Sequence, residues 1–261
     1  MAGLNLIQEY SSDTDDEAKN SNEENQTGFN VAKPSRLPLP ESILSLKGVE
    51  HHTDVVDDPL KHQGRIRSFK HERGNWASLV YLDYDPSEEI LQWMKNTVGE
   101  ILKTGNLFEE FHVSLTRTLI LKFHWIDSFV EAVKNIARNY PGFVMELNGI
   151  KVYCNDDKTR TFLGITVQST NNSLGSLTGT LNKLLDEYQL PPFYEDALFH
   201  VSIWWCVGDH KQILETLLPK LTSNFHEFLT NHPEHHFVQV DSLKCKIGNK
   251  LYTFNLSEFK F

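Results

Sequence analysis

The tetrapeptide Phe-His-Val-Ser occurs twice in this chain, at residues 111–114 and again at residues 199–202. Each copy lies in a short, mostly apolar run that is typical of a strand, in which successive side chains point to opposite faces. The histidine and the serine of each copy therefore share an outer face, while the phenylalanine and the valine face a core. The same alternation predicts that Thr116 and Trp204 also lie on the outer faces. Two histidines presented in matching ways suggest one active site built from two halves.

Such a pair can perform general acid and base catalysis near neutral pH, because the unperturbed pKa of histidine is about 6.5. His112 and His200, placed across a cleft, can take a proton from a ribose 2′-hydroxyl and deliver one to the departing 5′-oxygen. The product is a 2′,3′-cyclic phosphate, and the reaction needs no metal. Ser114 and Ser202 are placed to donate hydrogen bonds to non-bridging phosphate oxygens as charge builds up.

Structural roles for these residues stay open at this point. Either histidine taken singly also fits a half-buried strand residue that is hydrogen-bonded to a neighbouring serine. Tyr194 lies on an irregular segment after two prolines and can stack on a base. A packing tyrosine at the entrance of a strand fits the same spacing. The shared register and matching flanks of the two copies favour the catalytic interpretation of the histidines.

Strands and helices must position these residues, and they interleave along the chain. Alternating or helical spacing of apolar residues, together with proline and glycine breaks, defines their limits. We expect strands at 76–84, at the two Phe-His-Val-Ser copies, and at 143–154, 161–168, 236–247 and 250–256, and helices at 86–102, 125–139, 173–188 and 209–229. The last two strands are expected to form a hairpin through Gly248-Asn249. The predicted fold class is α+β, with two pseudo-symmetric lobes of antiparallel sheet and flanking helices around a central cleft.

The composition is that of an ordinary soluble globular protein: 261 residues, of which 39% are hydrophobic and 23% are charged. No apolar run approaches the roughly 20 residues that span a bilayer, and the N-terminus lacks a signal-peptide hydrophobic region. We therefore expect neither a membrane nor a secreted role. Cys154, Cys206 and Cys245 are widely separated, which fits buried or half-buried thiols in a reducing compartment better than a zinc or disulfide framework.

The formal net charge of −10 is concentrated at the start of the chain. Residues 1–33 carry seven acids against two lysines, a net of −5. We predict that they form a disordered tail, and that the segment from Pro34 to Pro40 is an extended linker. Basic clusters at residues 65–73 and at Lys158 and Arg160 suit a short oligonucleotide end, whereas long duplex DNA needs many phosphate contacts. We divide the chain into a tail and linker, residues 1–64, and a two-lobed domain, residues 65–261.

Three longer segments carry a resemblance to a known family: residues 65–76, 158–164 and 193–209. With the paired His-x-Ser strands, they resemble the two-histidine (2H) phosphoesterase superfamily, and within it the U6 small nuclear RNA phosphodiesterases. The resemblance runs from Arg65 to the C-terminus and leaves out the tail and linker.

The resemblance implies a nuclear 3′ to 5′ exoribonuclease that trims the oligouridine 3′ end of U6 small nuclear RNA and leaves a 2′,3′-cyclic phosphate, without metal or cofactor. By position, His112 and His200 match the catalytic pair, Ser114 and Ser202 the phosphate-binding partners, and Tyr194 the base-stacking tyrosine. We assign His200 as general base and His112 as general acid. The expected partner is a single-stranded, uridine-rich RNA 3′ end, bound by a monomer, with no DNA or membrane partner.

Two other classes stay open from the sequence. One is a different 2H enzyme, such as a cyclic-nucleotide phosphodiesterase or an RNA ligase-like protein. The other is a non-catalytic RNA-binding module in which the histidines are structural. No role is assigned to residues 116–118, which follow the first motif.

Overall fold

The computed structural model describes residues 59–64, 69, 72–194 and 198–258, all within one unit that spans Asp54–Phe261. The predicted tail, and most of the linker and of the basic cluster at 65–73, lie outside the described residues. The domain boundary between residues 64 and 65 therefore stays a prediction. Among the described residues, no helix is both long and apolar enough to cross a membrane.

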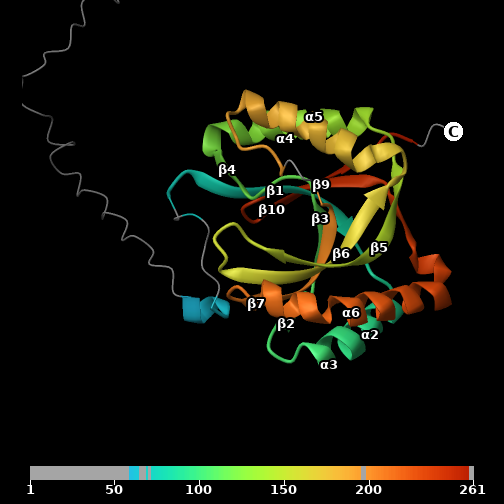
Figure 1. The fold of residues 1–261 in the computed structure, drawn as a ribbon. Helices are drawn as coiled ribbons and strands as arrows, with labels where there is room; N and C mark the ends of the chain where they lie inside the picture. Colours follow the sequence, from blue (N-terminus) through green and yellow to red (C-terminus); the bar gives the residue numbers. More distant parts are fainter. Residues whose placement is uncertain (1–58, 65–68, 70–71, 195–197, 259–261) are drawn as a thin grey trace, which may run out of the picture. The chain divides into compact units, whose positions relative to one another are not determined.

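The described part of the chain contains a ten-stranded sheet (Figure 1). Its main path runs β10-β9-β1-β3-β7-β6-β5-β8, with β2 added to β7 and β4 added to β1. The strands are β1 (Asn75–Tyr84), β2 (Asn106–Leu107), β3 (Phe111–Ser114), β4 (Leu119–Lys122), β5 (Phe143–Cys154), β6 (Arg160–Ser169), β7 (His200–Val207), β8 (Phe237–Val240), β9 (Ser242–Ile247) and β10 (Lys250–Asn255). Neighbours along this path are antiparallel, which confirms the predicted pairing.

The sheet has two halves that meet where β3 pairs with β7. One half contains β10, β9, β1 and β3, and the other contains β7, β6, β5 and β8. Each half ends in one copy of Phe-His-Val-Ser, so the copies are on neighbouring strands although their histidines are 200 − 112 = 88 residues apart. The arrangement agrees with the predicted pair of pseudo-symmetric lobes.

Helices cover the strands on two sides (Figure 1): α4 and α5 lie together on one side, and α6 lies with α2 and α3 on the other. Their bounds are α2 (Glu88–Trp93), α3 (Gly99–Ile101), α4 (Ile126–Asn139), α5 (Ser173–Glu187) and α6 (Lys211–Asn231), with a π-helical turn, Met94–Val98, between α2 and α3. In α4, Phe129, Val133 and Ala137 recur every four residues and are fully buried. This apolar stripe is what an amphipathic helix needs in order to pack on a sheet.

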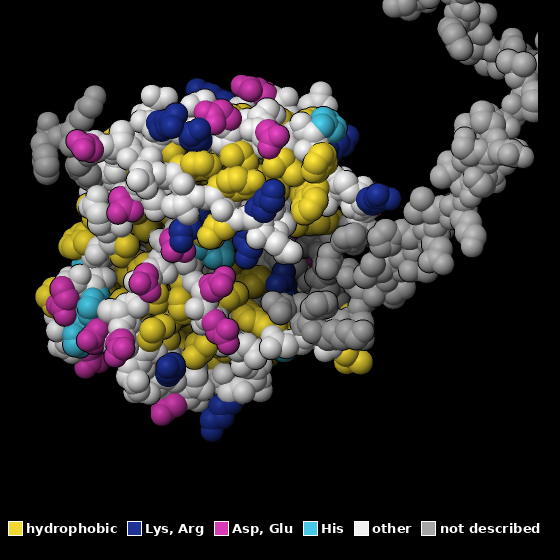
Figure 2. All heavy atoms as spheres, turned by 180° about the vertical axis from the view of Figure 1, so that it is seen from behind, with side chains coloured by type: hydrophobic (Ala, Val, Ile, Leu, Met, Phe, Trp, Pro, Cys, Tyr) yellow, Lys and Arg dark blue, Asp and Glu magenta, His cyan; other side chains and the backbone are white. Residues whose placement is uncertain are grey.

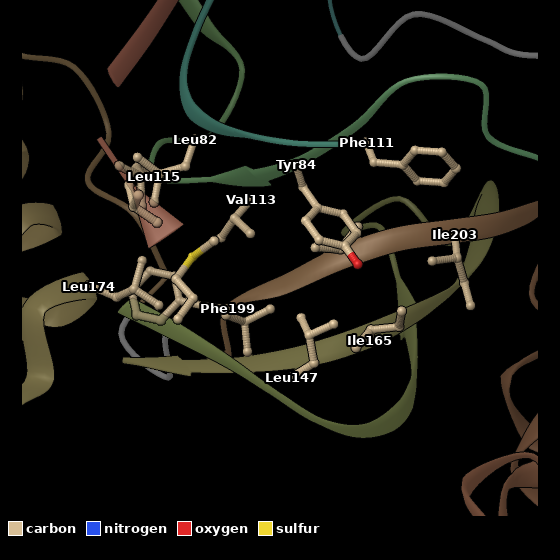
Figure 3. Packing of buried hydrophobic residues seen from close by; sticks show 14 of the residues in the cluster. Leu82, Tyr84, Phe111, Val113, Leu115, Leu147, Ile165, Leu174, Phe199 and Ile203 are labelled. Carbon is tan, nitrogen blue, oxygen red and sulfur yellow. The ribbon is translucent and has the colours of Figure 1, made fainter. Parts of the chain in front are cut away.

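The hydrophobic core fills the space between the two halves (Figure 3). Val113 of β3 points into it from one half, and Ile165 of β6 points into it from the other. Both side chains are fully buried. The phenylalanine and valine of each motif are buried in this core. Because side chains alternate along a strand, the histidine and serine of each motif point to the opposite face.

Most predicted elements are confirmed to within two residues at each end, including the strand at 143–154 and the helices at 125–139, 173–188 and 209–229. The single strand predicted at 236–247 is wrong. The chain breaks at Asp241, so that β8 pairs with β5 while β9 pairs with β1 in the other half of the sheet. The hairpin of β9 and β10 is confirmed, and Gly248 occupies its turn with a φ of +55°. The short strands β2 and β4 were not predicted.

Two predictions about outer faces are also wrong. Thr116 is 1% exposed, because β3 ends at Ser114 and the Thr116 hydroxyl accepts a hydrogen bond from the backbone N–H of Val80. Trp204 is 2% exposed. The register between β6 and β7 shifts beside Gly164, and such a bulge reverses which face the following side chains take.

Candidate active site

The two His-x-Ser pairs lie side by side on neighbouring strands. β3 and β7 pair antiparallel with the two motif valines, Val113 and Val201, opposite each other. This register places each histidine opposite the serine of the other strand. Since both valines are fully buried, the polar side chains of both motifs are turned to one common face.

A pocket of about 900 Å³ lies on this face. It brings together every site residue predicted from the sequence: His112, Ser114, Tyr194, His200 and Ser202. The remaining lining residues are Leu79, Thr116, Arg117, Thr118, Tyr153, Cys154, Asn155, Asp156, Phe162, Pro191, Pro192, Phe193 and Leu198. Near the middle of the face drawn in Figure 2, histidine side chains are exposed beside Lys and Arg side chains.

The imidazole of His200 is held by two contacts. Its Nδ1 donates a hydrogen bond to the carbonyl oxygen of Leu198, at 2.8 Å, which leaves Nε2 of the neutral ring with its lone pair. The ring of Tyr153 stacks on the imidazole, with centroids 3.7 Å apart and planes 16° apart. Tyr153 comes from β5 and reaches His200 on β7 across β6, where Gly164 has no side chain to intervene. A Cβ at Gly164 would lie 3.0 Å from Cδ2 of His200.

The pKa of His200 lies below the usual value for histidine, mainly because the imidazole is buried. The hydrogen bond to Leu198 opposes this shift, and the charges of His112 and Lys151 add to it. Near neutral pH the ring is therefore neutral and Nε2 can accept a proton. This is the state that a general base requires.

His112 has carboxylates beside it. Asp83 lies opposite it on β1, and Glu110 lies two residues before it, immediately ahead of β3. Burial lowers the pKa of His112, while the charges of Asp83 and Glu110 oppose that shift and Lys246 adds to it. The ring also contacts Tyr81, with centroids 5.1 Å apart. Burial outweighs the carboxylates, so the pKa of His112 lies below the usual value for histidine. The two carboxylates nevertheless stabilise the imidazolium form, which is the form that a general acid requires.

Tyr194 forms a cluster with Arg117 and Asp156 in the same pocket. The guanidinium carbon of Arg117 lies 3.8 Å from the centroid of the Tyr194 ring, a cation–π contact. Nη1 of Arg117 lies 3.1 Å from Oδ2 of Asp156. Burial and then the charge of Asp156 raise the pKa of Tyr194. The tyrosine is nevertheless 41% exposed, so part of its surface is open to a ligand.

The described pocket residues include no group of three His, Cys, Asp or Glu ligand atoms close enough to hold a metal ion. The cysteines are free, with Cys206 and Cys245 buried and Cys154 half-buried, as expected from the sequence. What the pocket does present is two imidazoles, two hydroxyls and an aromatic cluster. The imidazoles can take one proton from, and donate another to, oxygens bonded to a phosphorus, and the aromatic cluster can stack on a ring of the same ligand.

Known proteins resemble most of this chain. A family model described as HVSL, an uncharacterised conserved protein, matches residues 37–255. The U6 snRNA phosphodiesterase 1 of Danio rerio is 36% identical over 226 residues, which is 85% of this chain and 81% of the relative. The chain belongs to the U6 snRNA phosphodiesterase 1 family. The member of this family from Xenopus laevis is 36% identical over 244 residues, 90% of this chain and 97% of the relative.

A solved structure has the same fold as this member of the U6 snRNA phosphodiesterase 1 family. The structure of Kluyveromyces marxianus Usb1 with uridine monophosphate matches with a TM-score of 0.51 and 19% sequence identity, over 70% of this chain and 98% of Usb1. The likeness confirms the α+β fold class predicted from the sequence.

Three residues of the pocket that contact the predicted site residues of this U6 snRNA phosphodiesterase 1 family member were not identified from the sequence: Arg117, Tyr153 and Asp156. Gly164, which adjoins the pocket, was not identified either. Only Gly164 leaves a signal in the sequence, because a glycine inside a strand of apolar and β-branched residues often marks a close approach of another group. The basic cluster of Lys158 and Arg160 lies where β5 turns into β6, and neither residue lines the pocket.

Proposed function

We propose that this chain is a 3′ to 5′ exoribonuclease that trims the oligouridine 3′ end of U6 small nuclear RNA by metal-independent 2′-hydroxyl attack. The observation that carries the proposal is the placement of two His-x-Ser pairs on adjacent antiparallel strands, facing one pocket. Family membership supports the substrate, since the relatives are named for phosphodiesterase action on this RNA.

The reaction begins with His200 as general base. Its Nδ1–H is donated to Leu198, so Nε2 has the free lone pair that takes the proton of the 2′-hydroxyl of the penultimate nucleotide. The 2′-oxygen then bonds to the adjacent phosphorus while the bond from phosphorus to the 5′-oxygen of the last nucleoside breaks. His112, beside Asp83 and Glu110, donates the proton that this leaving oxygen needs. The terminal nucleoside departs, and the shortened RNA ends in a 2′,3′-cyclic phosphate.

Ser114 and Ser202 stabilise the charge that develops on the phosphate. The β3–β7 register puts each hydroxyl opposite the histidine of the other half, so a phosphate between the imidazoles lies between the hydroxyls as well. Hydroxyl donors on the non-bridging oxygens act where negative charge accumulates in the transition state.

Tyr194 binds the base of the terminal nucleotide by stacking, and the neighbouring Arg117 fixes the orientation of the Tyr194 ring. DNA is not a substrate, because it lacks the 2′-hydroxyl nucleophile. We further propose that the protein acts as a monomer in the nucleus, where U6 small nuclear RNA is the partner, and that it needs neither metal nor cofactor. The Usb1 structure with uridine monophosphate makes this nucleotide a suitable first probe of the pocket.

The test is mass spectrometry of RNA ends after reaction of the full chain with an RNA that terminates in uridines. Stepwise loss of 3′ uridines, ends with a cyclic phosphate, and unchanged rates in EDTA are expected. An RNA with a 2′-deoxy penultimate nucleotide is the matched control and should stay intact. Cleavage of that control, or inhibition by EDTA, would contradict the mechanism. Absence of shortening would favour another 2H enzyme, such as a cyclic-nucleotide phosphodiesterase, or a non-catalytic RNA-binding module.

A further inference from the structure

A second cluster of histidine and carboxylate groups lies away from the pocket, where α6 ends. His232 follows α6 directly, and Glu234 and His235 belong to the 3₁₀ turn η5 (Pro233–His235) before β8. One ligand atom from each of these three side chains lies within 4.8 Å of the others. Figure 2 shows histidine side chains interleaved with Asp and Glu side chains at its left edge.

The distances inside the cluster are those of groups that converge on one point. Nδ1 of His232 lies 3.6 Å from Oε1 of Glu234, and Nε2 of His235 lies 3.7 Å from the same oxygen. In a tetrahedral zinc site with ligands at about 2.0–2.1 Å, neighbouring ligand atoms are about 3.3–3.4 Å apart. The two distances to Glu234 are within a few tenths of an ångström of this spacing, and the two histidine nitrogens lie within 4.8 Å of each other. Rotation of these side chains can therefore bring the three ligand atoms to coordination distance.

A further carboxylate approaches His235 from a distant part of the chain, although it is not among the three side chains whose ligand atoms all lie within 4.8 Å of one another. Oε2 of Glu89, in the first turn of α2, lies 3.5 Å from Nε2 of His235. The hydroxyl of Ser87 lies 3.2 Å from the same nitrogen. Because Ser87 also caps α2 by accepting from the N–H of Ile90, it keeps a partner when a metal ion replaces its contact with His235.

The histidine rings are held in place before any ion binds. Phe228 of α6 packs against His232, with ring centroids 4.8 Å apart, and against His235, at 6.1 Å. The two imidazoles are themselves nearly parallel, with planes 24° apart. Restricting the rings in this way lowers the entropy that coordination would otherwise cost.

We propose that His232, Glu234, His235 and Glu89 form a structural zinc site that ties the start of α2 to the connection between α6 and β8. Two imidazole nitrogens and two carboxylate oxygens suit Zn²⁺, whereas Mg²⁺ and Ca²⁺ prefer oxygen ligands throughout. None of the four residues lines the catalytic pocket, so the ion takes no part in the reaction. Its effect is on stability, because it joins two segments that are far apart in sequence.

The test is calorimetric titration of the full chain with ZnCl2, together with thermal unfolding in ZnCl2 and in MgCl2. One equivalent of zinc should bind and raise the Tm, while MgCl2 should have no such effect. His232→Asn and Glu234→Gln change exposed side chains and should weaken zinc binding by roughly 10–100-fold or more. Glu89→Gln should weaken it as well.

The matched control is His236→Asn. This histidine is the next residue in the chain and pairs with Glu146 at 3.3 Å, outside the cluster. It should bind zinc with the affinity of the unaltered protein. The proposal is overturned if zinc fails to bind, if binding survives unchanged in His232→Asn and Glu234→Gln, or if His236→Asn weakens it equally. Unchanged affinity in Glu89→Gln alone would overturn the role of Glu89.

Discussion

The phenol ring of Tyr153 stacks on the imidazole of His200, with centroids 3.7 Å apart and planes 16° apart. The contact spans a whole strand, since Tyr153 is on β5, His200 is on β7, and β6 lies between them. It exists because the intervening residue is Gly164, whose Cα leaves room for both rings. In the other half, the tyrosine beside His112 is Tyr81, which comes from the directly neighbouring strand β1. The two halves therefore support their histidines in different ways.

Tyr153→Ala should lower kcat/KM by roughly two- to tenfold, because an aromatic pair is worth ~0.5–1.5 kcal/mol beyond its buried area. Loss of the ring also exposes His200, so its pKa should rise and the acid limb of the pH–rate profile should move to higher pH. Tyr153→Phe keeps the stack and should behave as the unaltered protein. A defect in Tyr153→Phe as large as that in Tyr153→Ala would assign the effect to the phenol hydroxyl instead.

Gly164→Ala should impair catalysis more than binding. The added Cβ would lie 3.0 Å from Cδ2 of His200 and 3.1 Å from the carbonyl oxygen of Val201, so the imidazole must move. Crowding of this kind costs typically ~1–3 kcal/mol, and kcat should fall with little change in KM. The control is Gly179→Ala in α5, where the added Cβ would have no atom within 4 Å apart from its two chain neighbours and the backbone of its own helix. That variant should keep full activity and be more stable by about 0.5–1 kcal/mol.

His112→Ala and His200→Ala should each lose cleavage by roughly 10²–10⁴-fold while remaining folded. His124→Ala, at an exposed histidine outside the pocket, is the control and should cleave normally. Rates of 3′ uridine release and circular dichroism provide the two readouts. Normal cleavage by either pocket variant would rule out the two-histidine mechanism.

The order of the two roles can be tested with a substrate whose leaving 5′-oxygen is replaced by sulfur. A thiolate leaves without a proton, so this substrate should restore the rate of His112→Ala but not that of His200→Ala. Restoration of His200→Ala instead would exchange the two assignments.

Tyr194→Ala should raise the KM for uridine-ended RNA by about 5- to 100-fold, because stacking of a base on an aromatic ring is worth ~1–3 kcal/mol. Arg117→Ala should produce a smaller increase, since Arg117 orients the ring from 3.8 Å. Lys158→Ala, a loss of positive charge outside the pocket, serves as the control. Equal effects from Lys158→Ala and Arg117→Ala would mean that general charge, and not the contact with Tyr194, is responsible.

Acid should destabilise the protein through the two pocket histidines. Burial lowers the pKa of each in the folded state, so below the ordinary pKa of about 6.5 the unfolded chain binds more protons than the folded one. The free energy of unfolding should therefore be unaffected by these groups above that pH and decrease as the pH falls below it. In the His112→Gln, His200→Gln double variant, denaturant titrations from about pH 7 to about pH 5 should show a shallower decrease. An identical decrease in both proteins would contradict the shifts.

The chain's local patterns predict much of the fold because burial acts on each element separately. The leucines of α5, such as Leu174, Leu177 and Leu181, recur at helical spacing and are all buried. The spacing of apolar residues along one strand fails to predict burial where the pairing with a neighbouring strand determines which way a side chain points. Trp204 follows the motif alternation in sequence, but a bulge against β6 turns it into the core.

The amino-acid sequence by itself determined the chemical groups of the site: two histidines and two serines, each on a face that strand alternation sets, and Tyr194 on the irregular segment before the second motif. The tertiary structure decided which strands are neighbours. Pairing of β3 with β7 placed the two motifs in one pocket, and crossing of β6 at Gly164 brought Tyr153 onto His200. Arg117 and Asp156 joined Tyr194 in the same way. The physical reason is that alternation depends only on the backbone of one strand, whereas a contact between strands depends on the packing of the whole sheet.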